Sequence, residues 1–165
     1  MLRQPIDGRL DFAHRTFQEF MAAQAAVGEG DIGLLVSNAT NPQWREVIVL
    51  GAGLARRAER SEMIRALLTK GDNDPANRHQ LHLLAAACQD TAGDLDAEVK
   101  KEVENRIEKL VPPKSLSDAI LLAEAAGEIA VPFLKYGPLL RARQAAASVR
   151  ALALIGSLES LPKRL

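Results

Sequence analysis

The spacing of apolar residues changes close to the N-terminus of this chain. Leu10 and Phe12 alternate with polar residues, as they would on a strand. Phe17, Phe20 and Met21 instead follow the spacing of one face of a helix. The pattern therefore predicts a strand that leads directly into a helix.

The residues before this junction predict a β-hairpin. Leu2–Ile6 and Arg9–Ala13 flank Asp7-Gly8, a dipeptide favoured in two-residue hairpin turns because both positions tolerate a positive φ. The following helix should run from His14 to about Val27. An isolated hairpin is marginally stable in water, so we expect this one to lean on the helix or on a further partner, as it would inside a larger domain.

Beyond this helix the pattern is helical almost throughout. Asp31, Asn41-Pro42, Asp74-Pro75 and Ser115 are typical helix starts, because their side-chain oxygens can accept a bond from a free backbone N–H and proline loses nothing at the first helical position. Further helices should begin near Ser61, at Asp94 or Asp96, and at Leu139, and should end at Gly71, at Val111-Pro112-Pro113 and at Gly156. The residues expected to face inward are Trp44, Val47, Ile48, Gly51, Leu54, Ala55, Met63, Ile64, Leu67, Leu68, Leu81, Leu84, Cys88, Val99, Val103, Ile107 and Leu110.

Two apolar helical segments resemble each other. Leu83–Cys88 and Leu121–Ala126 lie 38 residues apart. Helix pairs that recur at such an interval are typical of HEAT and armadillo arrays. We therefore predict an all-α fold, a HEAT/armadillo-like helical-repeat array with a short N-terminal β-hairpin. Ser157–Pro162 is similar to the opening of another repeat, which indicates truncation at the C-terminus.

Composition agrees with packed helices. The chain has 165 residues, enough for a substantial core, with 47% hydrophobic but only 4% aromatic residues. The formal net charge is zero, which gives no electrostatic reason to expect nucleic acid or an anionic membrane as a partner. Residues 90–128 are acidic and residues 131–165 basic, which indicates either solvated helix faces or complementary contact between neighbouring segments or subunits.

The single cysteine, Cys88, excludes an intrachain disulfide. No apolar run approaches the ~20 residues that a membrane span needs, and Met1–Pro5 lack the pattern of a signal peptide. Both observations favour a cytoplasmic protein.

Candidate chemistry is sparse. Gly51-Ala52-Gly53 lacks the third glycine of a dinucleotide loop, so we interpret it as close helix packing. His79 and His82 are one helical turn apart, but zinc normally takes three or four protein ligands, and Asp72 and Asp74 fall in a predicted loop. We interpret the histidines as exposed and predict no metal site. No nucleophile–base arrangement stands out, so we predict no catalytic centre.

His14 is the one candidate site residue. The free N–H groups and dipole of a helix N-terminus attract anions, and a histidine there can donate a hydrogen bond to a phosphate supplied by another domain. The alternative is a side chain that only caps or orients the helix.

The run Leu10–Ala23 resembles a motif of the NACHT-type STAND NTPases, a family that includes NLR-like proteins. Family members carry a stretch close to F-x-H-x-[ST]-F-Q-E-[FY]-[LM]-A-A at the end of the winged-helix domain. Gln43–Ala55 is similar to the helix that often follows in bacterial members. Together the two segments cover about the first third of the chain.

The resemblance implies a signalling switch built from a P-loop ATPase or GTPase core, a winged helix and a helical sensor region, often in antiviral defence. Residues 1–28 would end the winged-helix domain, and residues 29–165 would form the HEAT-like region. The resemblance assigns His14 a contact with the β-phosphate of ADP, and it assigns Phe17, Phe20 and Met21 to the apolar face that seats this helix.

The P-loop and the magnesium-binding acid are absent from this chain. We therefore expect no cofactor in this chain alone, with ATP or ADP and magnesium bound by the NTPase domain. That domain and a sensed protein or ligand, which the sequence does not identify, would be its partners. The alternative is a free-standing helical-repeat adaptor that binds a protein or peptide; an enzyme built on a helical bundle ranks third.

Overall fold

The computed structural model describes residues 2–6, 9–12, 15–134 and 140–159, and this part of the chain is mainly helical. The α-helices are α1 (Arg15–Gly28), α2 (Ile32–Ser37), α3 (Arg45–Leu54), α4 (Arg57–Asn73), α5 (Arg78–Thr91), α6 (Ala97–Leu110), α7 (Leu116–Ala126) and α8 (Ala142–Glu159). Two 3₁₀ segments, η1 (Pro42–Trp44) and η2 (Gly127–Phe133), precede α3 and follow α7. Within these residues no helix combines the length and apolar character needed to cross a membrane.

Two short strands precede α1. β1 (Leu2–Ile6) and β2 (Arg9–Phe12) are antiparallel, with Leu2 opposite Phe12 and Ile6 opposite Arg9. The predicted Asp7-Gly8 turn lies outside the described residues.

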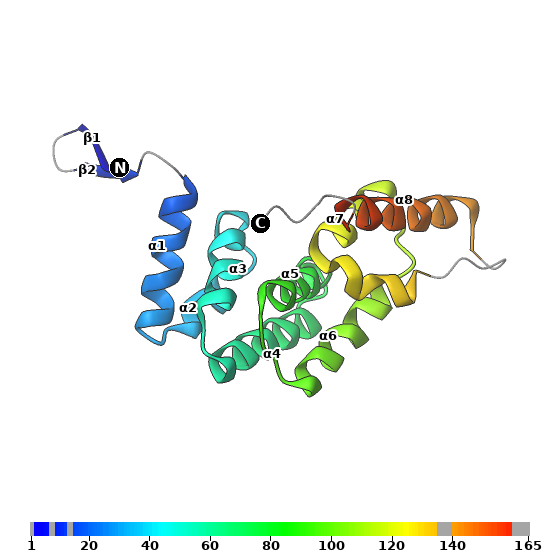
Figure 1. Cartoon of the computed structure of the whole chain (residues 1–165), viewed down its shortest axis with the longest axis horizontal. Coiled ribbons are helices and arrows are strands. Elements are labelled where there is room, and N and C mark those ends of the chain that lie inside the picture. Colours follow the sequence, from blue (N-terminus) through cyan, green and yellow to red (C-terminus); the bar gives the residue numbers. More distant parts are fainter. Residues whose placement is uncertain (1, 7–8, 13–14, 135–139, 160–165) are drawn as a thin grey trace.

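The helices form two layers that follow the chain from one end to the other (Figure 1). α1 packs on α3, α3 on α5, and α5 on α7, while α2 packs on α4, α4 on α6, and α6 on η2. The last helix, α8, packs on α7 and η2. α1, α3, α5 and α7 therefore make one layer and α2, α4, α6 and η2 the other, the arrangement of a repeat-like array of helix pairs.

Three predicted helix starts are confirmed by their caps. Asp31 Oδ1 accepts a hydrogen bond from the Leu34 backbone N–H at 2.9 Å, Asn41 Oδ1 accepts from Gln43 at 3.0 Å, and Ser115 Oγ accepts from Asp118 at 3.1 Å. Asp74 acts differently, because it follows α4 and its carboxylate accepts bonds from the backbone and side chain of Asn77. It thus stabilises the turn that precedes α5.

Four predicted helix boundaries are wrong, at both ends of α4 and at both ends of α8. α4 begins at Arg57 instead of Ser61, because the Glu59 carboxylate accepts a bond from the Arg56 backbone N–H at 3.0 Å and fixes an earlier first turn. α4 also continues past Gly71, and α8 starts at Ala142 and continues past Gly156. Glycine costs a helix only about 1 kcal/mol relative to alanine, so packing of the remaining face overrides it.

Most of the predicted core is confirmed. The buried members of the predicted stripes are Val47, Ile48, Gly51, Ala55, Met63, Ile64, Leu67, Leu68, Leu81, Leu84, Cys88, Val99, Val103 and Ile107. Leu54 is an error, since its side chain is 41% exposed at the end of α3. Trp44 and Leu110 are partly buried against the core.

Helix α5 is buried more completely than its sequence stripe predicts. Every residue from Leu81 to Cys88 is buried. The cause is its central position, because α3, α4, α6 and α7 all pack against it. A helix covered on several sides loses the polar face that defines an amphipathic pattern.

Gly51 confirms the packing interpretation of the Gly51-Ala52-Gly53 segment. It lies within α3, where an added Cβ would come within 2.9 Å of Leu35 Cδ1. The missing side chain therefore lets α3 approach α2 closely.

A buried arginine ties three segments of the array together. Arg60 of α4 donates hydrogen bonds to the carbonyl oxygens of Ala52 at 2.6 Å, Gly53 at 3.2 Å and Ala55 at 2.8 Å. Its Nη1 also donates to the Asp94 carbonyl at 2.7 Å, in the connection between α5 and α6. The last carbonyls of a helix have no partner inside the helix, so Arg60 serves as a cap supplied by the next helix.

Candidate functional site

The predicted phosphate contact, His14, lies outside the described residues and stays a prediction. The described part of α1 begins with Arg15, whose Nε lies 2.8 Å from Glu19 Oε1. Phe17, Phe20 and Met21 expose 50%, 38% and 41% of their surface, respectively. The apolar face of α1 therefore lies largely outside the core.

The two segments that carry the family resemblance meet in the structure. α1 packs on α3, and Ala23 and Ala26 are its buried residues. A shallow hollow of about 550 Å³ lies along this contact. It is lined by Arg15, Gln18, Glu19, Ala22, Gln43, Trp44 and Val47.

The predicted exposure of the two histidines is wrong for His82. His82 retains 3% of its surface, whereas His79 is half-buried. His82 is enclosed because Gly71 has no side chain, and a Cβ there would lie 2.7 Å from His82 Cδ2. The predicted loop position of Asp72 is also wrong. Asp72 belongs to the last turn of α4 and lies beside His82.

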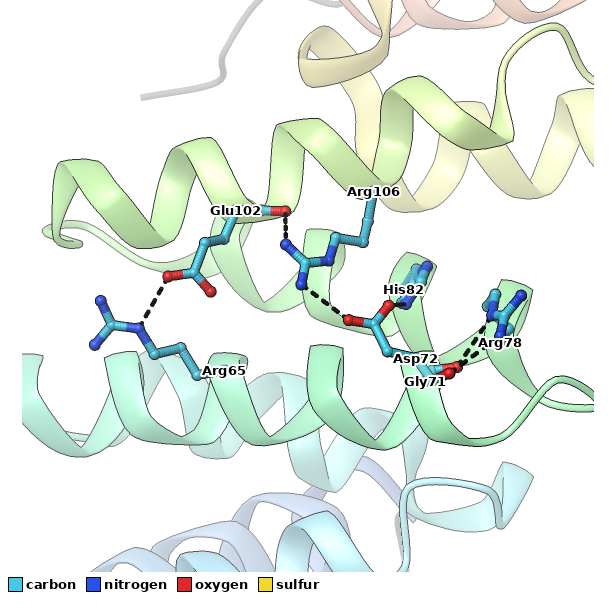
Figure 2. Close-up of polar contacts among 7 residues, drawn as sticks. All are labelled: Arg65, Gly71, Asp72, Arg78, His82, Glu102 and Arg106. Carbon is cyan, nitrogen blue, oxygen red and sulfur yellow. Dashed lines mark hydrogen bonds and ion pairs between the residues drawn. The ribbon is translucent and has the colours of Figure 1, made fainter.

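Asp72 joins three helices (Figure 2). Its Oδ1 lies 3.1 Å from His82 Nε2 of α5, and its Oδ2 accepts a bond from Arg106 Nη2 of α6 at 2.9 Å. The contact between His82 Nε2 and Asp72 Oδ1 has the distance of an ion pair but poor geometry for a hydrogen bond. The ring also has a hydrogen bond with the backbone of Leu68.

The environment shifts both ionisable groups. Burial lowers the pKa of His82 below its ordinary 6.5, against the opposing pull of Asp72. The hydrogen bond from Arg106 lowers the pKa of Asp72 below 3.8. The folded state near neutral pH therefore holds a neutral imidazole beside a charged carboxylate that is already paired with a guanidinium.

More ion pairs connect α4 with α6 and the residues just before it. Arg65 Nε lies 3.2 Å from Glu102 Oε1 (Figure 2), and Arg57 Nη2 lies 2.8 Å from Asp96 Oδ1. Part of the acidic stretch thus meets arginines of α4, which lie outside the basic stretch 131–165. These pairs are partly exposed, so solvent screens them and each contributes little to stability.

Two clefts flank the start of α5, and His79 lines both. The apolar cleft has a volume of about 580 Å³ and is lined by Ala39, Pro42, Arg45, Ala76, His79, Gln80, Leu83, Leu84, Leu121, Glu124 and Ala125. The basic cleft has a volume of about 560 Å³ and is lined by Asp72, Pro75, Arg78, His79, His82, Lys109, Leu110, Val111, Pro112, Lys114, Asp118 and Gln144. Both are in the size range of small-ligand sites.

The chemistry of these side chains favours binding over proton transfer. His82 Nε2 is inaccessible to solvent and faces Asp72, so in this conformation it cannot reach a substrate atom. Among the described residues, no three histidine, cysteine, aspartate or glutamate side chains are placed to hold a metal ion.

Comparisons of the chain with protein-family models, with curated proteins and with solved structures found no match.

Proposed function

We propose that this chain is the C-terminal helical portion of a NACHT-type signalling NTPase. In this proposal β1, β2 and α1 end the winged-helix domain, and α2 to α8 form a HEAT-like array. The array makes protein contacts and relays conformational change, in a cytoplasmic antiviral defence system of the NLR-like kind. The proposal rests on the motif Leu10–Ala23 and on the face that α1 presents.

The observation that carries the proposal is the apolar face of α1. Phe17, Phe20 and Met21 are spaced as neighbours on one helical face and are largely exposed. The fully buried residues of α1 are Ala23 and Ala26, and Val27 is partly buried against the core. Clustered exposed large apolar side chains are typical of a surface that a partner covers. In the proposal this partner is the nucleotide-binding module.

The packing of α1 supplies a route for the relay. α1 packs on α3 across the small hollow that Trp44 helps to line, and α3 packs on the central helix α5. His14, at the start of this helix by the sequence motif, would donate a hydrogen bond to the β-phosphate of ADP. Movement of α1 on nucleotide exchange would then act directly on the first pair of the array.

The test uses the protein expressed together with its upstream coding sequence. His14→Ala should speed ADP release from that protein, whereas His79→Ala, which removes a histidine far from α1 in sequence, should leave release unchanged. Upstream sequence that lacks a P-loop would refute the proposal. Equal ADP release from the two variants would refute the role of His14.

The apolar face gives a second, independent readout. Phe20→Ser and Met21→Ser should weaken the contact between the array and the NTPase module, measured as protease sensitivity of the junction. Leu34→Ser is the matched control, because Leu34 is 40% exposed on α2. An equal effect of all three substitutions would argue against a specific α1 contact.

The apolar cleft favours one alternative, a free-standing adaptor that binds a peptide between α5 and α7. Leu121, which is 49% exposed, forms part of its wall beside the buried Leu83 and Leu84. An adaptor would bind its peptide without nucleotide or upstream sequence, and Leu121→Asp would abolish that binding. Dependence of binding on ADP or ATP would exclude this alternative.

A further inference from the structure

The basic cleft gathers cationic side chains from separate elements. Arg78 comes from the first turn of α5, Lys109 from the last turn of α6, and Lys114 from the α6–α7 connection. Arg78 is held in place, because its Nε donates to the Gly71 carbonyl at 3.3 Å and its Nη2 to the Asp72 carbonyl at 3.0 Å (Figure 2). Segments distant in sequence thus bring positive charge to one concave surface.

The two carboxylates that line the basic cleft do not cancel this charge. Asp72 is already paired with Arg106, which lies outside the lining. The other carboxylate, Asp118, stands in the first turn of α7. The residues of the cleft together with Arg106 therefore carry more positive than negative charge near neutral pH, which favours an anionic ligand.

His82 lines the cleft, and its Nε2 lies 3.1 Å from Asp72 Oδ1. Its side chain is 4% exposed, so the ring lies near the cleft without facing solvent. A negative charge in the cleft would favour the protonated imidazole, which would then form an ion pair with Asp72.

Part of the cleft lining is apolar. Leu110, Val111 and Pro112 lie between the two lysines in sequence, and Pro75 faces the cleft from the α4–α5 connection. Sites for small organic ligands combine such apolar walls with a few polar groups that fix the orientation. The lining thus suits a molecule with one charged end and an apolar body.

We propose that the basic cleft binds a small organic anion. Its phosphate or carboxylate head is held by Lys109, Lys114 and Arg78, and its apolar body lies on Leu110, Val111 and Pro112. The inference goes beyond the proposed function and does not depend on it, because none of these residues belongs to the segments that carry the family resemblance. It gives the array a site for a small-molecule signal.

The experiment is a titration of the full chain with three probes, followed by NMR of the backbone amides and by calorimetry. Phenyl phosphate and phenylacetate test the two kinds of head group, and inorganic phosphate tests a head group without a body. At least one organic probe should shift the amides of residues 109–114 saturably. Inorganic phosphate should bind roughly tenfold more weakly, because it lacks the apolar contact.

Charge variants identify the site. Lys109→Glu with Lys114→Glu should weaken binding of the organic probe by roughly tenfold or more, whereas Lys100→Glu with Lys101→Glu, exposed on the same helix but outside the cleft, should not. Asp118→Asn should tighten binding by removing a repelling charge. Circular dichroism of each variant separates loss of binding from loss of fold.

The pKa of His82 distinguishes specific binding in the cleft from nonspecific accumulation of anions near the lysines. Binding should raise the pKa of His82, followed through its ring carbon resonances, because the anion favours the imidazolium form. Absence of saturable shifts would overturn the proposal. So would equal affinity for inorganic phosphate and the organic probes, or equal weakening by the two lysine pairs.

Discussion

Replacing Arg60 with methionine tests whether one side chain holds the loops of the array. The change keeps most of the apolar stem but removes every donor to the carbonyls of Ala52, Gly53, Ala55 and Asp94. Arg60 is only 9% exposed, so water has little access to replace those bonds. The substitution therefore leaves helix-end carbonyls without a partner.

The size of the effect follows from those bonds. The bonds to Ala52 and Ala55 are buried, while those to Gly53 and Asp94 are partly buried. A buried polar group left without a partner costs about 1–3 kcal/mol, and a partly buried one recovers a hydrogen bond to water. Removal of the buried guanidinium also relieves its own desolvation, so we expect a net loss of about 2–4 kcal/mol in the free energy of unfolding.

Urea denaturation followed by circular dichroism measures this difference. Arg57→Met is the matched control, because Arg57 lies on the same helix, is 57% exposed and pairs with the exposed carboxylates of Asp94 and Asp96. Solvent screens these pairs, so their loss should change stability little. Arg60→Lys should fall between wild type and Arg60→Met, since one ammonium cannot span the four carbonyls. Equal losses in Arg60→Met and Arg57→Met would refute the capping role.

Gly71→Ala should destabilise the fold by about 1–2 kcal/mol despite the better helix propensity of alanine, because its Cβ would press on the His82 ring. Gly156→Ala should instead stabilise the fold by about 0.5–1 kcal/mol, because the space around Gly156 is open. Thermal unfolding of the two variants measures both effects. The lowered pKa of His82 means that the unfolded chain binds a proton which the folded chain does not. The free energy of unfolding should therefore fall as the pH drops below 6.5, by up to about 1.4 kcal/mol per pH unit, and His82→Gln should flatten this dependence in urea titrations at several pH values. Burial raises the pKa of the Cys88 thiol to about 12, so iodoacetamide should label Cys88 only after unfolding, as mass spectrometry will show; rapid labelling of the folded chain would contradict its burial.

Local signals made several features predictable. Asp31, Asn41 and Ser115 cap helices because the interaction involves only neighbouring residues and needs no tertiary context. The stripe of Val99, Val103 and Ile107 was equally predictable, because α6 keeps a charged outer face. Helical periodicity therefore identified the elements and most of their buried sides.

Features that depend on distant residues could not be predicted in the same way. Nothing near Arg60 in sequence marks it as buried, since its partners belong to the end of α3 and to the α5–α6 connection. The Asp72–His82–Arg106 contacts likewise join three helices. The sequence indicated a helix end at Gly71, whereas in the structure the missing side chain of Gly71 leaves room for the His82 ring. The basic cleft requires the relative placement of α5, α6, α7 and α8, which the pattern of one helix does not contain.

The unequal burial of α1 and α5 sets the order in which the array should open. α5 contributes every residue from Leu81 to Cys88 to the core, whereas α1 contributes Ala23 and Ala26, which bury little area per residue. Amide hydrogens of α1 should therefore exchange with solvent through a local opening, long before those of α5, which require global unfolding. We therefore expect α1 to detach from α3 while the rest of the array stays folded.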